Sequence, residues 1–466
     1  MVFLIFLLSV SRLCAQLDHG QGEMSGEVTQ TSAIIQSRLT KGSELLNGDL
    51  PGQAGWAQFE VSRHSDMSAA LSTGWREVFT EDDHIVKAQL DLLEPGTQYY
   101  FRLVFGPDPQ KVTYGKTCSF RTLPKSDKPT TVRFAVISEM NYHAFHDGPN
   151  AYRGDDKDRG YPALESIRKF EPDFVVAAGN SVFYDHPSKS VAQTVKSMRQ
   201  RWHVQFSQPR FRDLFDHVPF YWQKNDHDYR YDDADASGDR LPSHKDGMAV
   251  FKEQVPVVNP FRKEGPTYRT FRIGKYVQIW LTESRDYRSP NTAADGPEKT
   301  MWGETQRAWL ERTLSANDAT FKFLISPTPL IGPDSILKRD NQSNVEGFAF
   351  EGDGFISWLY GKGFYDKNFF ILCGDMPWQY YSIHPTGFEE FSCGTLVDAN
   401  AQKGISPGDP GSTDPNRLIS QRYTSAVPSG GFLTVEVTPN ADIVAALVFR
   451  DEKGIELYRV EKSADK

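Results

Sequence analysis

The spacing of hydrophobic residues divides the chain into two parts. From about Met24 to Leu123, short alternations of apolar and polar residues recur between turn clusters such as Asn47-Gly48. Alternation with a period of two is typical of strands that bury one face. The alternation predicts strands at 32–39, 57–62, 85–90, 98–105 and 118–122. We therefore predict a small all-β domain and place it at residues 20–123.

One turn in this part has a specific pattern. A corner at Pro95-Gly96 leads to Tyr99 on the next predicted strand. Such a corner is typical of a tyrosine corner, in which the tyrosine hydroxyl bonds back to the backbone. The segment resembles a fibronectin type III domain and holds no cluster of catalytic residue types. We expect it to pack against the rest of the chain.

After a polar linker at 122–130, continuous apolar runs alternate with segments of helical periodicity. The runs predict buried strands at 132–137, 173–178, 220–222, 277–281, 321–325 and 369–373. The periodic segments predict helices at 162–170, 191–206, 208–215, 304–314 and 355–360. The last segments, 431–437, 441–449 and 455–460, predict an antiparallel meander. Strands that alternate with helices indicate a layered α/β domain, predicted at 131–466.

The first fifteen residues form a third pattern. Val2 to Val10 is almost unbroken apolar sequence, followed by Ala15 and a polar stretch. The run is too short for a spanning helix, which needs about 20 apolar residues. It predicts a signal peptide at 1–15 and a secreted or periplasmic location; a buried N-terminal strand is the alternative. We expect no membrane span later in the chain.

Composition narrows the functional classes. The chain has 39% hydrophobic and 24% charged residues, with a formal net charge of -9. This mixture is typical of globular proteins. It contains no long run of Lys or Arg, so we expect no nucleic acid as a specific partner. Beyond the leader, Cys118, Cys373 and Cys393 form no disulfide scaffold, and Cys373 and Cys393 are either paired or free.

Candidate chemistry lies where predicted strands end. Four such ends are rich in carboxylates, amides and histidines: 138–143, 179–186, 224–229 and 373–378. Open α/β sheets bind ligands at the carboxyl ends of their strands. Hard cations select carboxylate oxygens, and iron and zinc also accept imidazole and phenolate. Together the four ends have the residue types that a dinuclear hydrolase needs.

These four ends, taken in order, resemble the alkaline phosphatase D (PhoD) family of metallophosphoesterases. The resemblance extends over nearly the whole chain from Thr131 and includes segments 283–288 and 303–310. It implies a layered α/β/β/α sandwich preceded by a small all-β domain of fibronectin type III type. It also implies a phosphoester hydrolase that acts on a small-molecule or extracellular phosphoester. The metal ions that it implies are iron and calcium (Fe and Ca).

The resemblance also implies roles for single residues. The implied metal ligands are Glu139, Asn180, Tyr184, Asp226 and Asp375. His227 would steady or protonate the leaving group, and Arg285 and Arg288 would hold phosphate oxygens. For the two arginines, ion pairs with Glu283 or Asp286 are the alternative. Asp232, Asp233 and Asp235 are expected to form a solvated acidic loop, with calcium binding as the less favoured interpretation.

Three positions depart from the family pattern. In the family motif Gly-Asp-x-x-Tyr, the aspartate that bridges two metals is replaced by Asn180. In Gly-Asp-x-His, the histidine is replaced by Pro377, and Glu139 stands where a cysteine or aspartate is expected. A neutral amide offsets less of the repulsion between two cations. We therefore predict a degenerate metal site with weak or absent hydrolysis; a one-metal hydrolase of a different ester and an inactive relative that acts as a binding or scaffold protein are the alternatives.

Overall fold

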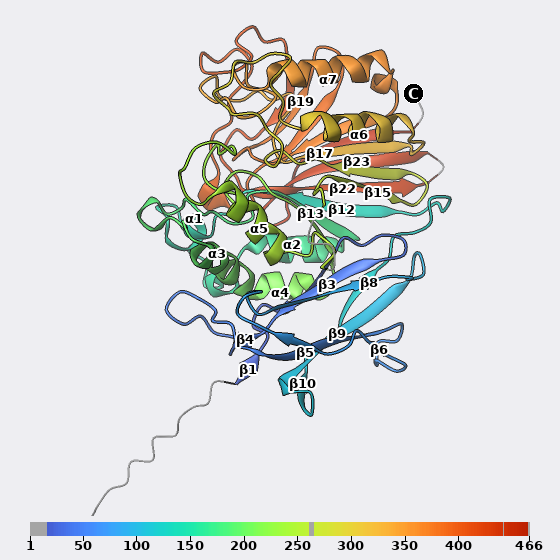
Figure 1. Cartoon of the computed structure of the whole chain (residues 1–466). Helices are drawn as coiled ribbons and strands as arrows, with labels where there is room; N and C mark the ends of the chain where they lie inside the picture. Colours follow the sequence, from blue (N-terminus) through green and yellow to red (C-terminus); the bar gives the residue numbers. More distant parts are fainter. Residues whose placement is uncertain (1–15, 261–264, 441, 465–466) are drawn as a thin grey trace, which may run out of the picture.

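The computed structural model describes residues 16–260, 265–440 and 442–464. Two large sheets pack face to face in the larger part of the chain (Figure 1). The first has nine strands in the order β24-β23-β22-β12-β13-β14-β2-β3-β8. The second has seven, in the order β15-β16-β17-β18-β20-β19-β21. The predicted leader, 1–15, lies outside the described residues.

The centre of the first sheet is parallel. Its strands β12 (Val132–Ile137), β13 (Phe174–Ala178) and β14 (Phe220–Gln223) pair in parallel register. An antiparallel meander of β22 (Gly431–Pro439), β23 (Ile443–Asp451) and β24 (Glu456–Ser463) continues it on one side. All five residues of β13 are buried, because alternate side chains enter the cores on its two faces. These strands confirm the predicted apolar runs.

The second sheet also has parallel strands in its middle. These are β16 (Val277–Leu281), β17 (Phe321–Ser326), β18 (Phe369–Cys373) and β20 (Glu389–Cys393). Antiparallel strands β15 (Arg269–Ile273), β19 (Gln379–Ile383) and β21 (Ser420–Thr424) complete it. The strands β15, β19, β20 and β21 were not predicted, since short strands with polar residues give little periodic signal.

Helices cover both outer faces. The core against the first sheet is filled by α2 (Pro162–Phe170), α3 (Val195–Ser207), α4 (Pro209–Phe215) and α5 (His244–Gln254). The core against the second sheet is filled by α6 (Gly303–Ser315) and α7 (Ala349–Gly361). Shorter elements are α1 (Tyr142–Asp147) and the 3-10 turns η1 (Lys157–Arg159), η2 (Ser188–Ser190), η3 (Phe364–Asp366) and η4 (Asp398–Asn400). The result is the predicted helix, sheet, sheet, helix sandwich.

One helix begins later than predicted. Helix α3 starts at Val195 rather than near Val191, because Thr194 and Ser197 form a reciprocal capping box. Residues 191–194 are not helical, and η2 ends just before them. Helices α1 and α5 were not predicted.

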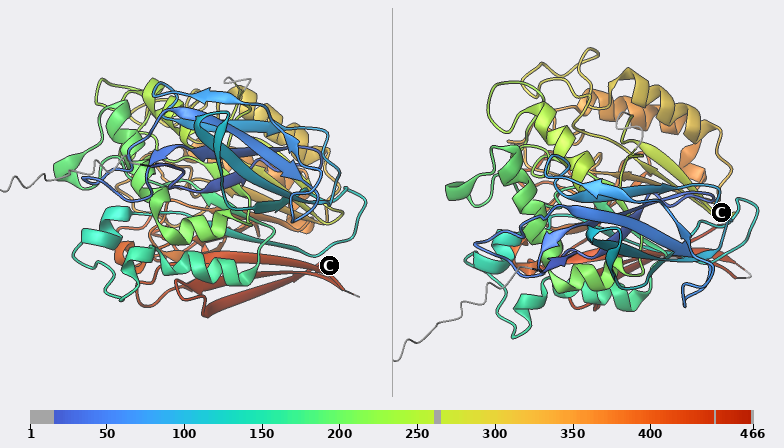
Figure 2. Two further views of the ribbon diagram at one scale, coloured as in Figure 1. Left: turned by 90° about the horizontal axis from the view of Figure 1, so that it is seen from below. Right: turned by 60° about the horizontal axis from the view of Figure 1, so that its bottom comes forward.

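The N-terminal part is all-β, as predicted. A six-stranded sheet contains β5 (Gly55–Ser62), β6 (Leu71–Ser72), β7 (Arg76–Val78), β9 (Gln98–Asp108), β10 (Lys111–Tyr114) and β11 (Cys118–Arg121). Facing it, β2 (Glu23–Gly26), β3 (Ala33–Arg38) and β8 (Ile85–Leu90) extend the nine-stranded sheet through one β14–β2 pair (Figure 2). A small pair, β1 (Leu17–Asp18) and β4 (Thr40–Lys41), lies apart. The part has its own apolar core, and its boundary at 123 stays a prediction.

The tyrosine corner is confirmed. The backbone N–H of Glu94 donates to the Tyr99 hydroxyl at 2.9 Å. Cys118, Cys373 and Cys393 are buried free thiols, so the structure has no Cys373–Cys393 disulfide. Within the described part of the chain, no helix has the length and hydropathy that crossing a membrane requires.

Candidate metal and phosphate site

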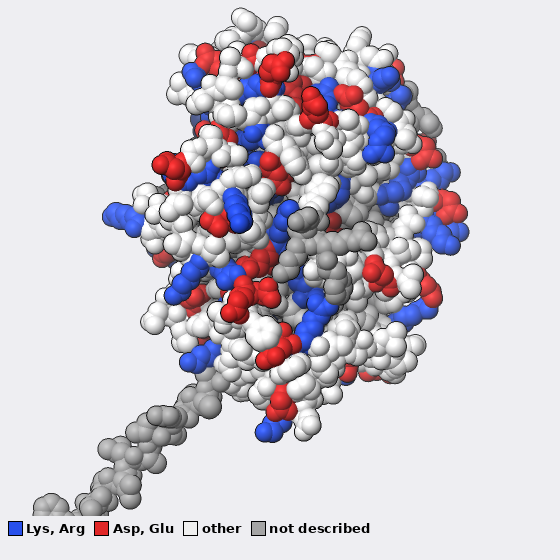
Figure 3. All heavy atoms as spheres, in the orientation of Figure 1, with Lys and Arg blue, Asp and Glu red and all other residues white. Residues whose placement is uncertain are grey.

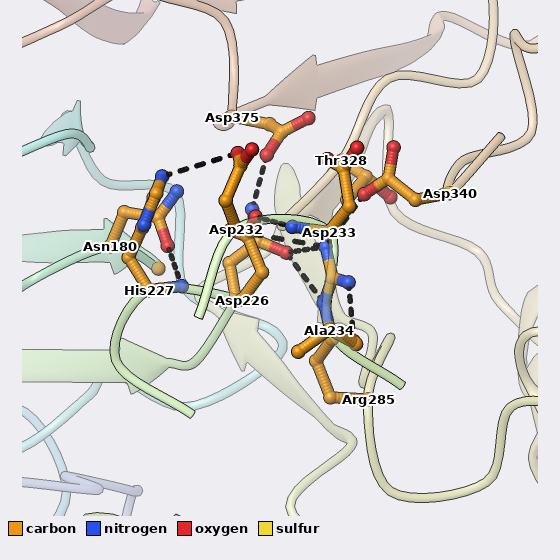
Figure 4. Close-up of polar contacts among 12 residues, drawn as sticks. Asn180, Asp226, His227, Asp232, Asp233, Ala234, Arg285, Thr328, Asp340 and Asp375 are labelled. Atoms are coloured by element: carbon orange, nitrogen blue, oxygen red, sulfur yellow. Dashed lines mark hydrogen bonds and ion pairs between the residues drawn. The ribbon is translucent and has the colours of Figure 1, made fainter. Parts of the chain in front are cut away.

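The four predicted strand ends meet at one place. Glu139 follows β12, Asn180 follows β13, and Asp226 and His227 follow β14, all in the first sheet. Asp375 follows β18 of the second sheet, and its carboxylate accepts a hydrogen bond from the Asn225 side chain at 2.5 Å. The site therefore lies where the carboxyl ends of the two facing sheets come together (Figure 4).

The backbone is strained at these ends. Glu139, Asn180 and Asp375 have φ angles of 56°, 55° and 73°. Side chains other than glycine rarely adopt this left-handed region, and such residues cluster at functional sites. Three strands in two sheets thus end in the same uncommon turn, which aims their polar side chains at a common point.

Asn180 uses both ends of its amide inside the protein. Its Oδ1 accepts from the His227 backbone N–H at 3.1 Å, and its Nδ2 donates to the Glu139 carboxylate. Glu139 also accepts from the Asn400 side chain at 3.1 Å. Burial raises the pKa of Glu139 to about 7. The amide therefore joins three segments by direct hydrogen bonds.

His227 is held by a carboxylate that the site prediction missed. Its Nδ1 lies 2.8 and 3.0 Å from the two carboxylate oxygens of Asp185. Burial lowers the pKa of His227, but the charges of Asp226 and Asp185 and the hydrogen bond to Asp185 raise it to about 10. The side chain is 12% exposed, and a neighbouring ring, Phe183, stacks on it at 4.2 Å between centroids. The imidazolium is thus oriented and charged at neutral pH. Asp185 lies within the run 179–186, so that run was the available signal.

The predicted ligand Tyr184 points elsewhere. Its ring is fully buried in the core beneath α3, and its hydroxyl accepts a hydrogen bond from Trp202 Nε1 at 2.7 Å. Counted from Asn180, the tyrosine of Gly-Asp-x-x-Tyr falls on Phe183, whose ring meets His227. Phe183 contacts His227 whereas the next residue, Tyr184, enters the core, so a shift of one residue exchanges site for core. Tyr184 is therefore a core residue, and Phe183 is a fourth position that departs from the family pattern.

Arg285 is fully buried, and each of its three guanidinium nitrogens donates a hydrogen bond. Its Nε and Nη2 donate to Asn225 Oδ1 at 2.9 and 2.6 Å, and its Nη1 donates to the Ala234 carbonyl at 2.9 Å. Its Nη2 also lies 3.1 Å from Asp340 Oδ2. The side chain therefore locks the segment after β14 to the loop that carries Asp340. The alternative ion pairs with Glu283 and Asp286 are absent among the described residues.

Arg288 is buried beside Arg285 but less completely bonded. Its Nη2 donates to the Asp340 carbonyl, whereas its Nε and Nη1 have no hydrogen-bond partner. Burial and the neighbouring charge of Arg285 lower the pKa of Arg288 to about 9. Arg288 thus has two nitrogens free for an anion, whereas every guanidinium nitrogen of Arg285 already donates a hydrogen bond.

An acidic trio forms the strongest candidate cation site. One oxygen each from Asp226, Asp233 and Asp340 lies within 4.8 Å of the other two (Figure 4). Asp226 and Asp340 are 1% and 0% exposed, and the Oδ1 atom of each has no hydrogen-bond partner. Buried acceptors are rarely left unsatisfied, and a cation with oxygen ligands would satisfy these two. Asp233 belongs to the loop predicted to be solvated, and Asp340 follows no predicted strand end, so no sequence pattern indicated it.

Comparison with known proteins identifies the family. Residues 134–384 match the model described as PhoD-like phosphatase. Residues 12–124 match the model of the N-terminal domain of PhoD-like phosphatases. The chain belongs to the PhoD-like phosphatase family.

Relatives agree with this assignment. Alkaline phosphatase D of Bacillus subtilis (strain 168) is 23% identical over 410 residues, which cover 80% of this chain and 66% of that relative, just under two thirds of its length. A solved structure of PhoD superposes with a TM-score of 0.72 at 18% identity, covering 96% of this chain and 89% of the other. Purple acid phosphatase PPD1 from yellow lupin gives 0.63 at 14% identity, covering 95% and 74%. These structural likenesses establish the fold.

The candidate ligand atoms of this PhoD-like chain suit some metal ions better than others. The trio of Asp226, Asp233 and Asp340 offers oxygen ligands only, as calcium and magnesium prefer. Two further groups include imidazole, namely Asp185 with His186 and His227, and Asp226 with His227 and Asp232. Both depend on His227, whose Nδ1 is bonded to Asp185. The phenolate that an iron site would accept is absent, since Tyr184 faces Trp202. Ca²⁺ or Mg²⁺ therefore fits the described residues better than iron.

The remaining PhoD-like departure is also built into the fold. The Pro377 carbonyl accepts from the Gln402 backbone N–H at 2.9 Å, and its side chain offers no ligand atom. Asp375 Oδ2 lacks a hydrogen-bond partner, and burial raises the pKa of this carboxyl well above its usual value. The Pro377 end of the site thus has an acceptor without the neighbouring imidazole of the family pattern.

Proposed function

We propose that this chain is a secreted, metal-dependent phosphoester hydrolase of the alkaline phosphatase D type with a degenerate metal site. The observation that carries the proposal is the His227–Asp185 pair beside the acidic trio, joined by Asp226, the neighbour of His227. An oriented, charged imidazolium next to a cation site is an arrangement suited to transferring a proton to a leaving group. The substrate class is a small-molecule or extracellular phosphoester.

The chain's own residues divide the work. His227, held protonated by Asp185 and Asp226, would donate its proton from Nε2 to the leaving oxygen. Arg288, with its free Nε and Nη1, would hold a phosphate oxygen, while Arg285 positions Asn225 and Asp340. When bound, a hard cation supplies Lewis acidity toward a phosphoryl oxygen. Because Asn180, Phe183 and Pro377 stand where the family pattern has ligands, we expect slow turnover.

A second candidate function is a non-catalytic binding or scaffold protein. It is favoured by Asn180, whose amide is hydrogen-bonded to His227 and Glu139, and by Phe183, which stacks on the His227 ring. In that case the fold and an anion pocket would remain, without hydrolysis. The two candidates differ in one measurable property, turnover.

The test compares the wild-type protein with His227→Asn on aryl phosphates. Purified protein is assayed with a mono- and a bis-aryl phosphate, each with added Ca²⁺, Mn²⁺ or Fe³⁺, and metal content is measured on the same samples. The hydrolase proposal expects slow hydrolysis that falls by at least about a hundredfold in His227→Asn. Absence of hydrolysis in the wild-type protein with every metal would favour the binding function, and equal measurable rates in the two proteins would exclude His227 as the proton donor.

The location rests on the leader. Removal of residues 1–15 would place the mature protein outside the cytoplasm. Exported protein whose first residue is still Met1 would contradict this part of the proposal.

A further inference from the structure

A lysine side chain reaches the acidic trio of Asp226, Asp233 and Asp340. Lys338 lies in the loop between β17 and α7, and its Nζ is 2.8 Å from Asp233 Oδ1 and 3.9 Å from Asp232 Oδ1. Although burial lowers it, the pKa of Lys338 is raised well above its usual value by the carboxylates of Asp340, Asp375 and Asp233. The ammonium is therefore charged and lies in the field of the trio.

Each member of the trio already faces a side-chain cation. Arg285 Nη2 is 3.1 Å from Asp340 and 4.0 Å from Asp226, and Lys338 pairs with Asp233. A divalent cation that enters the trio would lie close to two positive charges. Coulomb repulsion at such distances is substantial inside a protein, so one of the two side chains has to move.

The two cations differ in their freedom to move. Arg285 is fully buried, and each of its three guanidinium nitrogens donates a hydrogen bond. The Lys338 side chain is 34% exposed. A lysine is a point charge on a flexible stem, whereas a forked arginine is rigid. Lys338 is therefore the cation that can leave.

Hydrogen bonds within the loop order the segment next to Lys338 and Asp340. Asn344 Oδ1 accepts from the backbone N–H groups of Asp340 and Asn341 at 3.0 Å each. Asp334 Oδ2 in turn accepts from the side chains of Asn341 and Asn344 at 2.9 Å. One ordered loop thus supplies both an acidic ligand and a competing ammonium.

We propose that Lys338 is a tethered cation that competes with a hard divalent cation for the trio of Asp226, Asp233 and Asp340. The site would bind Ca²⁺ weakly while the ammonium stays in, and tightly once it is displaced or removed. This inference rests on the cation site of the proposed function, but not on hydrolysis.

The test is calorimetric titration of Ca²⁺ into the full chain carrying Lys338→Met, which keeps the length of the side chain and removes its charge. The matched control is Arg339→Met, because Arg339 pairs with exposed Glu346 away from the trio. We expect Lys338→Met to lower the Kd for Ca²⁺ by about tenfold or more and Arg339→Met to leave it unchanged. Adding Asp340→Asn to Lys338→Met should remove the gain.

A second neutral variant, Lys338→Gln, guards against a local folding defect, and thermal unfolding of each variant reports on its fold. A Ca²⁺ affinity in folded Lys338→Met and Lys338→Gln that is no higher than in wild type overturns the inference. Because only binding is measured, absence of hydrolysis would defeat the proposed function and leave this result standing.

Discussion

Two groups of buried carboxylates, one at the junction of the two parts and one at the candidate cation site, differ in how their oxygens are hydrogen-bonded. At the junction of the two parts, Asp83 is 5% exposed and both of its oxygens are satisfied. Its Oδ1 pairs with Arg38 at 3.1 Å, and its Oδ2 bonds to His203 and Gln254 at 2.7 and 2.8 Å. At the candidate cation site, Asp226, Asp340 and Asp375 each keep an oxygen without a hydrogen-bond partner.

The pKa shifts differ only in part, because His227 and Arg285 also lower the pKa of Asp226 despite its burial. Despite burial, His203 and Arg38 lower the pKa of Asp83 well below its usual range. At the strand ends, burial and neighbouring carboxylates raise the pKa of Asp233 to about 7. The junction gives both oxygens of Asp83 a hydrogen-bond partner, whereas the site keeps carboxylate oxygens that have none. On the face that Figure 3 shows, Lys and Arg side chains are interspersed with Asp and Glu side chains.

The largest effect is expected at the junction. Asp83→Asn leaves Arg38, which is 2% exposed, without its carboxylate, and breaking a buried pair costs about 3–5 kcal/mol. Urea unfolding should show this loss, while Asp127→Asn on the exposed linker should show almost none. A loss below about 1 kcal/mol would mean that the junction is no more stabilising than a surface ion pair.

The junction also predicts the pH dependence of this difference. Because the folded pKa of Asp83 is depressed, its contribution is fully present above the unfolded pKa of about 3.9. It is lost as pH falls through the folded value. The stability gap between wild type and Asp83→Asn should therefore be flat above about pH 5 and shrink in acid.

Restoring the ligands of the family pattern should change metal binding and hydrolysis at the candidate cation site. Asn180→Asp with Pro377→His should raise metal content and aryl-phosphate hydrolysis together, by about tenfold or more. The carboxylate that Asn180→Asp introduces would face Glu139, so without metal this variant should be less stable by roughly 1–3 kcal/mol, and added metal should restore it. The single variants and Phe183→Tyr separate the contributions. High metal content and fast hydrolysis in the wild-type protein would refute the degenerate site.

A smaller effect is expected from the carboxylate behind His227. Asp185→Asn should lower any hydrolysis by about tenfold to a hundredfold, because the imidazolium loses its charged partner. The alkaline limb of the pH profile should move to lower pH, since loss of Asp185 lowers the pKa of His227. Asp127→Asn, on the exposed linker away from the site, is the control. An unmoved alkaline limb would exclude His227 as the acid.

The smallest effect tests the corrected ligand. Tyr184→Phe leaves Trp202 Nε1 without its acceptor and should cost about 1–2 kcal/mol of stability. Metal content should not change. A fall in metal content at unchanged stability would return Tyr184 to the ligand set.

The sequence predicted what strand periodicity controls. Buried strands such as β12 and β18 were predicted at their observed bounds, and a polar run after a buried parallel strand predicts a position at the sheet edge. Asp226, His227 and Asp375 were therefore placed correctly together. Tyr184 was placed wrongly, because an irregular segment has no periodicity that predicts the direction of a side chain.

Loops account for the rest. Asp340 and Lys338 belong to a long connection whose shape depends on bonds among Asp334, Asn341 and Asn344. Those bonds join residues by loop geometry rather than by helical or strand spacing. No periodic pattern in the sequence indicates that this loop returns to the strand ends.

The most direct test of the site is the position of a bound cation. Crystals of the full chain carrying Lys338→Met, soaked in Mn²⁺, would locate the ion by its anomalous scattering. We predict a single peak bounded by Asp226, Asp233 and Asp340. A pair of peaks on either side of Asn180, or no peak at the trio, would contradict the proposed cation site.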